Sequence, residues 1–127
     1  MLRDGMMARR EDFYAAFQKD YRKPSAEVEA TEFMPVLDEI RHAIGSLKKW
    51  MKPTKVWPTI ASAMTSSWIE YQPRGRSLII APWNFPLAIF GGQIMAALVA
   101  GNTVAAKPAD QTPAIGQRFV RLLHACG

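Results

Sequence analysis

Asn84 and Lys107 are polar residues placed where a fold could use their chemistry, and Asp110 follows three residues after the lysine. The side-chain amide of Asn84 is a neutral donor that can meet a developing negative charge, as in an oxyanion hole. The ammonium group of Lys107 can donate to ribose hydroxyls or lie near a phosphate. Structural interpretations remain open, because asparagine often bonds its own turn and Lys107 and Asp110 can form a solvated pair.

The residues from 78 to 107 predict the elements that position these groups: a strand at 78–80, a helix at 87–100 and a strand at 103–106. Pro82 ends the first strand, because proline cannot donate to a sheet ladder. Pro86 suits the first helical position, and Gly101 is placed to cap the end of the helix. The second strand delivers Lys107 to the carboxyl edge of the sheet, where open α/β folds bind ligands. We therefore expect Asn84 and Lys107 to face one cleft.

Two motifs of this βαβ unit resemble the aldehyde dehydrogenase superfamily. Ala-Pro-Trp-Asn-Phe-Pro at 81–86 is similar to the family's Pro-Trp-Asn turn, and Lys-Pro-Ala-Asp-Gln-Thr-Pro at 107–113 is similar to its Lys-Pro-Ala-Glu-Gln-Thr-Pro strand end. The resemblance covers nearly the whole chain but only the opening portion of the family's chain. Residues at 39–43, 49–53 and 71–75 resemble the class 3-like branch, whereas 86–94 is nearer to the semialdehyde dehydrogenase domain of bifunctional proline-oxidising enzymes.

The resemblance implies an NAD(P)-dependent oxidation of an aldehyde to a carboxylic acid. Asn84 would hold the aldehyde oxygen while a downstream cysteine attacks and hydride passes to the nicotinamide. That cysteine and the family's glutamate base lie beyond Gly127, so the chain is expected to be inactive alone. A noncatalytic remnant or an interaction module with exposed apolar faces is the alternative. Cys126, the single cysteine, is predicted to be a buried helical thiol rather than a nucleophile.

By the same resemblance, Lys107 and Asp110 bind the cofactor, and its adenosine side is lined by the backbone of Ile80, Ala81 and Trp83. An acidic side chain at 110 can accept a hydrogen bond from a ribose 2′-hydroxyl and repel a 2′-phosphate, which favours NAD. NADP stays possible, because aspartate is one methylene shorter than the family's usual glutamate. The sequence contains no Gly-x-Gly-x-x-Gly phosphate loop.

The residues before the βαβ unit are predicted to have a structural role rather than a catalytic one. Apolar residues at helical spacing predict two helices: Leu2, Met6, Phe13, Phe17 and Tyr21 in the first, and Phe33, Leu37, Ile40, Ile44, Leu47 and Met51 in the second. These helices could pack as an antiparallel pair, and Pro35 should kink or restart the second one. Residues 67–71 predict one connector strand. In the family, the corresponding region bridges or joins subunits, which implies a homo-oligomer; exposure of Trp57 and Trp68 would fit that use, although core packing is equally compatible.

The predicted fold class is therefore α/β: a partial Rossmann-like cofactor domain, preceded by two helices and a connector strand. The expected division is a helical pair at 1–53, a connector with an oligomerisation-type strand at 54–75, and the first βαβ unit with its following helix at 76–127.

Composition and charge pattern argue against nucleic-acid binding, a membrane span and a metal site. The net charge is +5, but the basic residues are scattered and not interleaved with aromatic residues, which argues against nucleic-acid binding. No charged residue occurs between Arg76 and Lys107, yet prolines, glycines and asparagines interrupt this run, as in a buried strand-helix-strand unit and unlike a membrane span. We expect no metal site, because His42 and His124 lack companions at ligand spacing. One cysteine and no apparent signal peptide suit the cytoplasm.

Overall fold

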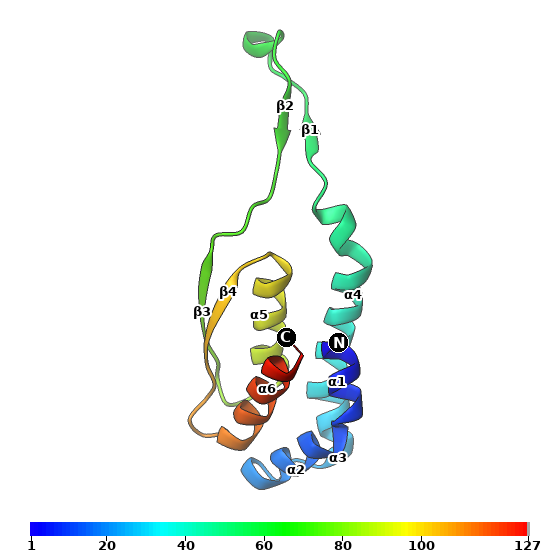
Figure 1. The fold of residues 1–127 in the computed structure, drawn as a ribbon, viewed down its shortest axis with the longest axis vertical. Helices are drawn as coiled ribbons and strands as arrows, with labels where there is room; N and C mark the ends of the chain where they lie inside the picture. The colour runs from blue at the N-terminus through cyan, green and yellow to red at the C-terminus, as the bar shows by residue number, and fades with distance from the viewer. Residues whose placement is uncertain (127) are drawn as a thin grey trace.

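The computed structural model describes residues 1–126. The elements follow in the order α1 (Leu2–Ala8), α2 (Arg10–Asp20), α3 (Ser25–Val28), a π-helical turn (Glu29–Phe33), α4 (Met34–Trp50), β1 (Thr54–Val56), a 3-10 turn (Ile60–Ser62), β2 (Ser67–Ile69), β3 (Arg76–Ile80), α5 (Ala88–Val99), β4 (Thr103–Lys107) and α6 (Pro113–Ala125). A layered body carries a long hairpin made of β1 and β2 (Figure 1). Within the body, α5 and α6 lie between the β3–β4 sheet and the N-terminal helices.

The predicted βαβ unit is confirmed. Strands β3 and β4 pair in parallel, with Ile80 opposite Lys107, and α5 connects them. Gly101 has a φ of +80° and its amide donates to the Leu98 oxygen at 2.9 Å, so it caps α5 as expected. The position predicted for Pro86 was wrong: α5 begins at Ala88, and the proline lies in the preceding turn.

The β3–β4 sheet is covered on one face only. Ile79 is buried, whereas Leu78 and Ile80 are 70% and 63% exposed. Side chains alternate between the two faces of a strand, and α5 packs against both strands. The expectation of a buried strand therefore holds for the face that meets α5 and is wrong for the other.

The N-terminal helices differ from their prediction in detail. The first helix is interrupted at Arg9, which separates α1 from α2. The main packing partner of α2 is α6, and that of α4 is α5, so α2 and α4 do not form the expected pair. Pro35 lies in the first turn of α4 after the π-helical turn, as a restart requires. The predicted apolar stripe is buried at Phe33, Leu37 and Ile40, whereas Ile44 and Met51 are exposed.

One core joins the helices to the sheet. Edge-to-face contacts between aromatic rings stabilise it: Phe13 with Phe33 at 5.7 Å, and Phe90 with Phe119 at 5.9 Å between centroids. Its largest fully buried apolar side chains are Phe13, Phe17, Phe33, Phe90, Phe119, Met6, Leu37, Leu87, Ile94, Ile115 and Leu122. Elements from both ends of the chain therefore share the core that supports the turn after β3.

The hairpin stands apart from this core. β1 and β2 pair antiparallel, with Lys55 opposite Trp68, and every residue of both strands is exposed. Trp57 is 89% and Trp68 58% exposed. Of the two alternatives that the sequence left open, exposure and core packing, the structure therefore shows exposure. β2 begins at Ser67 as predicted but ends at Ile69, two residues before the predicted end at 71.

Candidate functional site at the carboxyl edge of the β3–β4 sheet

Asn84 lies in the exposed turn between β3 and α5. The turn is tied to β4 at its start, because the Ala81 amide donates to the Lys107 oxygen at 3.0 Å. The main-chain oxygen of Asn84 accepts a hydrogen bond from the Tyr21 hydroxyl at 3.4 Å. Within residues 1–126, no hydrogen bond engages the Asn84 side-chain amide, so the bond to its own turn that we left open is not formed here. The amide is available to a ligand.

Lys107 is the last residue of β4, and its ammonium group binds Asp110. The distances from Nζ to the two carboxylate oxygens are 3.0 and 2.9 Å. The side chains are 53% and 83% exposed, which makes this the solvated pair considered as a structural alternative. Exposed ion pairs contribute about 0–1 kcal/mol, so a ligand hydroxyl can compete for either partner at small cost.

Ile80 ends β3, and Ala81 and Trp83 lie in the turn that follows it, just before Asn84 in the chain. Ile80 and Trp83 are exposed, whereas the Ala81 side chain is buried. The Trp83 ring lies 6.3 Å from the Tyr21 ring, in a tilted arrangement. The edge therefore presents an aliphatic and an aromatic surface beside the polar groups.

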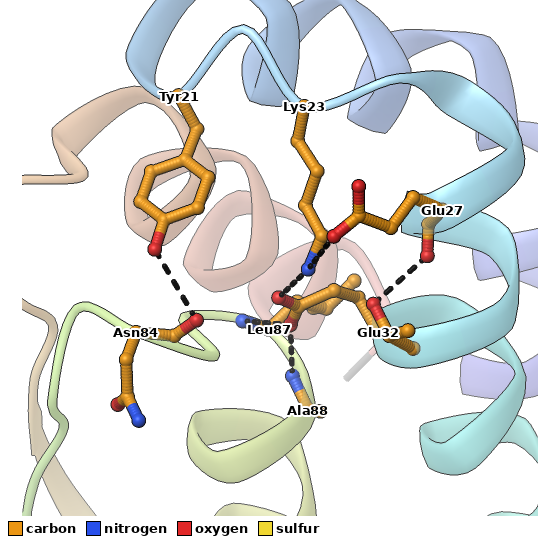
Figure 2. A network of polar contacts seen from close by, with 8 residues as sticks. Tyr21, Lys23, Glu27, Glu32, Asn84, Leu87 and Ala88 are labelled. Atoms are coloured by element: carbon orange, nitrogen blue, oxygen red, sulfur yellow. Dashed lines mark hydrogen bonds and ion pairs between the residues drawn. The ribbon is translucent and has the colours of Figure 1, made fainter.

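A buried ion pair supports the turn from the other side, and sequence reasoning missed it. Glu32 and Lys23 lie 2.9 Å apart, and the second carboxylate oxygen of Glu32 accepts hydrogen bonds from the amides of Leu87 and Ala88 (Figure 2). The local signal was weak: an acidic residue beside Phe33 looks like the polar side of a helix. Only the fold shows that it meets residues 55 positions away.

A groove lies elsewhere, between α4 and α5. Its volume is about 950 Å³ and its walls are mainly apolar, with Leu47, Trp50, Tyr71 and Met95 among the lining residues. Among the described residues that line it, none is a predicted site residue. The groove therefore gives no support to the predicted chemistry.

Other candidate chemistry finds little basis in the part of the chain that the structure describes. Cys126 caps the end of α6 and is half-buried, so it is more accessible than the buried thiol that we predicted. Over residues 1–126, no three His, Cys, Asp or Glu side chains gather as a metal site would require. The helices within these residues are too short or too polar to cross a membrane.

Comparison with known proteins identifies the family of the chain. The model of the family described as "Aldehyde dehydrogenase family" matches residues 1–127. A Pseudomonas aeruginosa protein named "Probable coniferyl aldehyde dehydrogenase" is 37% identical over 123 residues, which are 96% of this chain and 26% of that protein. The Rhizobium meliloti "Bifunctional protein PutA" is 47% identical over 89 residues, which are 70% of this chain and 6% of that protein.

A solved structure extends the likeness to the fold. The substrate-bound state of Staphylococcus aureus AldH superposes with a TM-score of 0.91 at 33% identity, over 98% of this chain and 27% of that one. This chain thus spans about a quarter or less of the length of these relatives. Matched along all of its residues by the family model, the chain belongs to the aldehyde dehydrogenase family.

Proposed function

We propose that the chain supplies the oxyanion donor and part of the cofactor site of an enzyme that oxidises an aldehyde to a carboxylic acid with NAD(P)⁺. One observation carries the proposal: the turn that bears Asn84 and the strand end that bears Lys107 are joined by the Ala81–Lys107 hydrogen bond at one sheet edge. The full reaction also needs the nucleophile and base that the family resemblance assigns to other residues. We call the chain together with the remaining part of the family's domain the complete enzyme.

In this proposal, Asn84 donates a hydrogen bond to the aldehyde oxygen. A thiolate adds to the carbonyl carbon, and the electron pair of the C=O bond moves onto that oxygen. A fixed amide donor stabilises the resulting charge more than it stabilises the neutral aldehyde, so it lowers the barrier. The exposed, unengaged Asn84 amide fits this use.

The polar residues at the edge fit a nicotinamide cofactor, which supplies a hydride acceptor when it is bound. The Lys107 ammonium and the Asp110 carboxylate form a donor and acceptor set suited to ribose hydroxyls. Ile80, Ala81 and Trp83 line the adenosine side in this assignment. Asp110 favours NAD over NADP because a carboxylate repels a 2′-phosphate.

The hairpin suits assembly, and we propose that the complete enzyme is a cytoplasmic homo-oligomer. Trp57 and Trp68 expose large aromatic surfaces on a hairpin that extends away from the core. Contact with a second subunit would cover them. The single cysteine of the sequence is compatible with a reducing compartment.

An assay of aldehyde-dependent NADH formation tests this function. The purified 127-residue chain is measured alone and again after addition of the remaining part of the domain. We expect no turnover from the chain alone and turnover from the complete enzyme. Turnover by the chain alone would contradict the assignment of the nucleophile, and a complete enzyme without turnover would contradict the function.

An interaction module without catalysis is the second candidate. The exposed apolar side chains of Leu78 and Ile80 on the open sheet face favour it, because such a face is typical of a surface that another polypeptide covers. Thermal melts separate the two candidates. Stabilisation by NAD supports the cofactor site, whereas stabilisation only by the remaining part of the domain supports the module.

A further inference from the structure

Glu32 is a fully buried charged residue that the proposed chemistry does not use. We infer that it is a positioning residue, which holds the turn that carries Asn84; the inference rests on the oxyanion role proposed above. Glu32 comes from the π-helical turn before α4 and reaches the start of α5 (Figure 2). Its side chain does not touch the reacting atoms, so any effect on catalysis must pass through the turn.

The start of α5 lacks a cap of its own. Its N-cap residue is Leu87, which has no side-chain acceptor, and its first turn contains no acidic residue. Amides at a helix start have no partner within the helix. Glu32 supplies one, since its Oε2 accepts from the amides of Leu87 at 3.1 Å and Ala88 at 2.9 Å. A carboxylate there also complements the positive end of the helix dipole.

Lys23 fixes the carboxylate in turn. Its Nζ lies 2.9 Å from Glu32 Oε1, and the side chains of the pair are 5% and 0% exposed. The same ammonium group lies 5.0 Å from the centre of the Phe85 ring, and Phe85 is the neighbour of Asn84. Removal of one partner would leave a buried charge with weaker compensation, because Lys23 would keep only the longer 3.8 Å contact to Glu27 and Glu32 only its hydrogen bonds from backbone amides, and this is destabilising. The pair is therefore a rigid support rather than a variable surface contact.

Contacts from both sides bracket Asn84. On one side, Ala81 is bonded to β4; on the other, Glu32 holds Leu87 and Ala88, and Tyr21 donates to the Asn84 oxygen. The Asn84 side chain takes part in none of these bonds, so they fix the backbone and leave the amide free for substrate (Figure 2). Loss of the Glu32 contacts should shift the amide without removing it.

The decisive experiment is a double-mutant cycle between Glu32→Gln and Asn84→Ala in the complete enzyme. Glutamine has one acceptor oxygen, and its NH₂ group cannot accept from Lys23, so it cannot make all the contacts of the carboxylate. We expect Glu32→Gln to lower kcat about tenfold or more and to leave the KM for NAD unchanged, since small displacements of a reacting donor have effects of this order. If Glu32 acts through Asn84, the fold-loss of kcat caused by Asn84→Ala should be at least five times smaller in the Glu32→Gln protein than in the wild-type protein. Coupling of this kind is expected for two residues that share one turn. Multiplicative effects of the two substitutions would overturn the inference.

Glu29→Gln is the matched control. Glu29 belongs to the same π-helical turn and is also paired, but with Arg10 at 3.3 Å and with Tyr14, away from the Asn84 turn. The same chemical change there weakens an ion pair whose side chains are 33% and 26% exposed, so it should cost less stability, and its effect should multiply with that of Asn84→Ala. Coupling of Glu29→Gln to Asn84 as strong as that of Glu32→Gln would show a general loss of structure and overturn the positioning role.

Hydrogen exchange gives a readout that does not depend on turnover. In Glu32→Gln, the Ala88 amide should exchange about tenfold faster than in the wild-type protein, because one acceptor is weakened. In Glu29→Gln it should exchange at the wild-type rate. Unchanged exchange in Glu32→Gln would refute the support of the turn even in an inactive protein. A different outcome is that the Ala88 amide exchanges faster in Glu32→Gln, while Asn84→Ala leaves aldehyde oxidation unchanged. That outcome would refute the oxyanion role and, with it, the effect of Glu32 on catalysis.

Discussion

The amide of Ala81 donates to the main-chain oxygen of Lys107 at 3.0 Å, and this bond continues the β3–β4 ladder past the end of β3. Asn84 follows three residues after the donor, and the acceptor residue itself carries the ammonium group of the candidate site. The distance between the two proposed functional groups is therefore governed by sheet geometry and by one short turn.

Lys107→Met should weaken NAD binding to the complete enzyme about tenfold, the effect of losing roughly one hydrogen bond from a charged group. Asp110→Asn should reduce the preference for NAD over NADP, because the repulsion of a 2′-phosphate is lost. Titration with each cofactor measures both effects. Asp38→Asn is the control: Asp38 pairs with Arg41 at 3.0 Å with the same exposed i,i+3 spacing, but on α4. Equal losses from Asp38→Asn and Lys107→Met would contradict the assignment.

Gly116→Ala should destabilise the fold by about 1–3 kcal/mol, because a β-carbon at this position would lie 2.4 Å from the Cβ of Pro108. Pro108 follows Lys107, so the substitution should also disturb the candidate site. Gly45→Ala is the matched change in an open position, with no atom within 4 Å of the added carbon, and should stabilise α4 by about 0.5–1 kcal/mol. Denaturant unfolding compares the two. Equal stabilities would show that the Gly116–Pro108 approach is wrong.

Stability should fall as the pH rises from about 10 to 12. Burial and the hydrogen bond to Glu29 raise the pKa of Tyr14 to about 12, whereas an unfolded tyrosine ionises near pH 10. The folded protein therefore retains a proton that the unfolded chain loses, and the contribution of Tyr14 is full below pH 10 and is lost through this window.

Tyr14→Phe should remove that part of the pH dependence. Unfolding free energies of both proteins across the alkaline range give the comparison, and the difference between the curves isolates Tyr14 from the lysines that also titrate. Parallel curves for the two proteins would contradict the raised pKa.

Local signals explain why the βαβ unit could be predicted from the sequence. The ring of Pro82 restricts its φ, whereas Gly101 adopts a positive φ that other residues rarely reach, and each marks an element boundary near itself. The start of α5 was misplaced because Pro86 gave a local helix signal, whereas the first capped amides are those of Leu87 and Ala88, which bond to a residue far away in the chain.

Burial and long-range support were harder to predict. The composition of 78–80 indicates a strand but does not tell which face another element covers, so the exposure of Leu78 and Ile80 was missed. Glu32 was missed for a related reason. Its role depends on a contact across 55 residues, and no periodicity within its own helix indicates the Leu87 amide. Asn84 and Lys107 could be singled out from their places at the strand ends, whereas Ile80, Ala81 and Trp83 came from the motif resemblance. The cofactor and substrate roles of these residues stay predictions.

The most direct test of the account is the turnover number of Asn84→Ala in the complete enzyme, measured as aldehyde-dependent NADH formation beside Gln93→Ala, which removes an exposed amide from α5. Loss of an oxyanion donor predicts that kcat falls by roughly 10²–10³ while NAD affinity is retained, and that Gln93→Ala matches the wild type. A kcat for Asn84→Ala within about threefold of the wild-type value, well short of the loss expected for such a donor, would contradict the central claim.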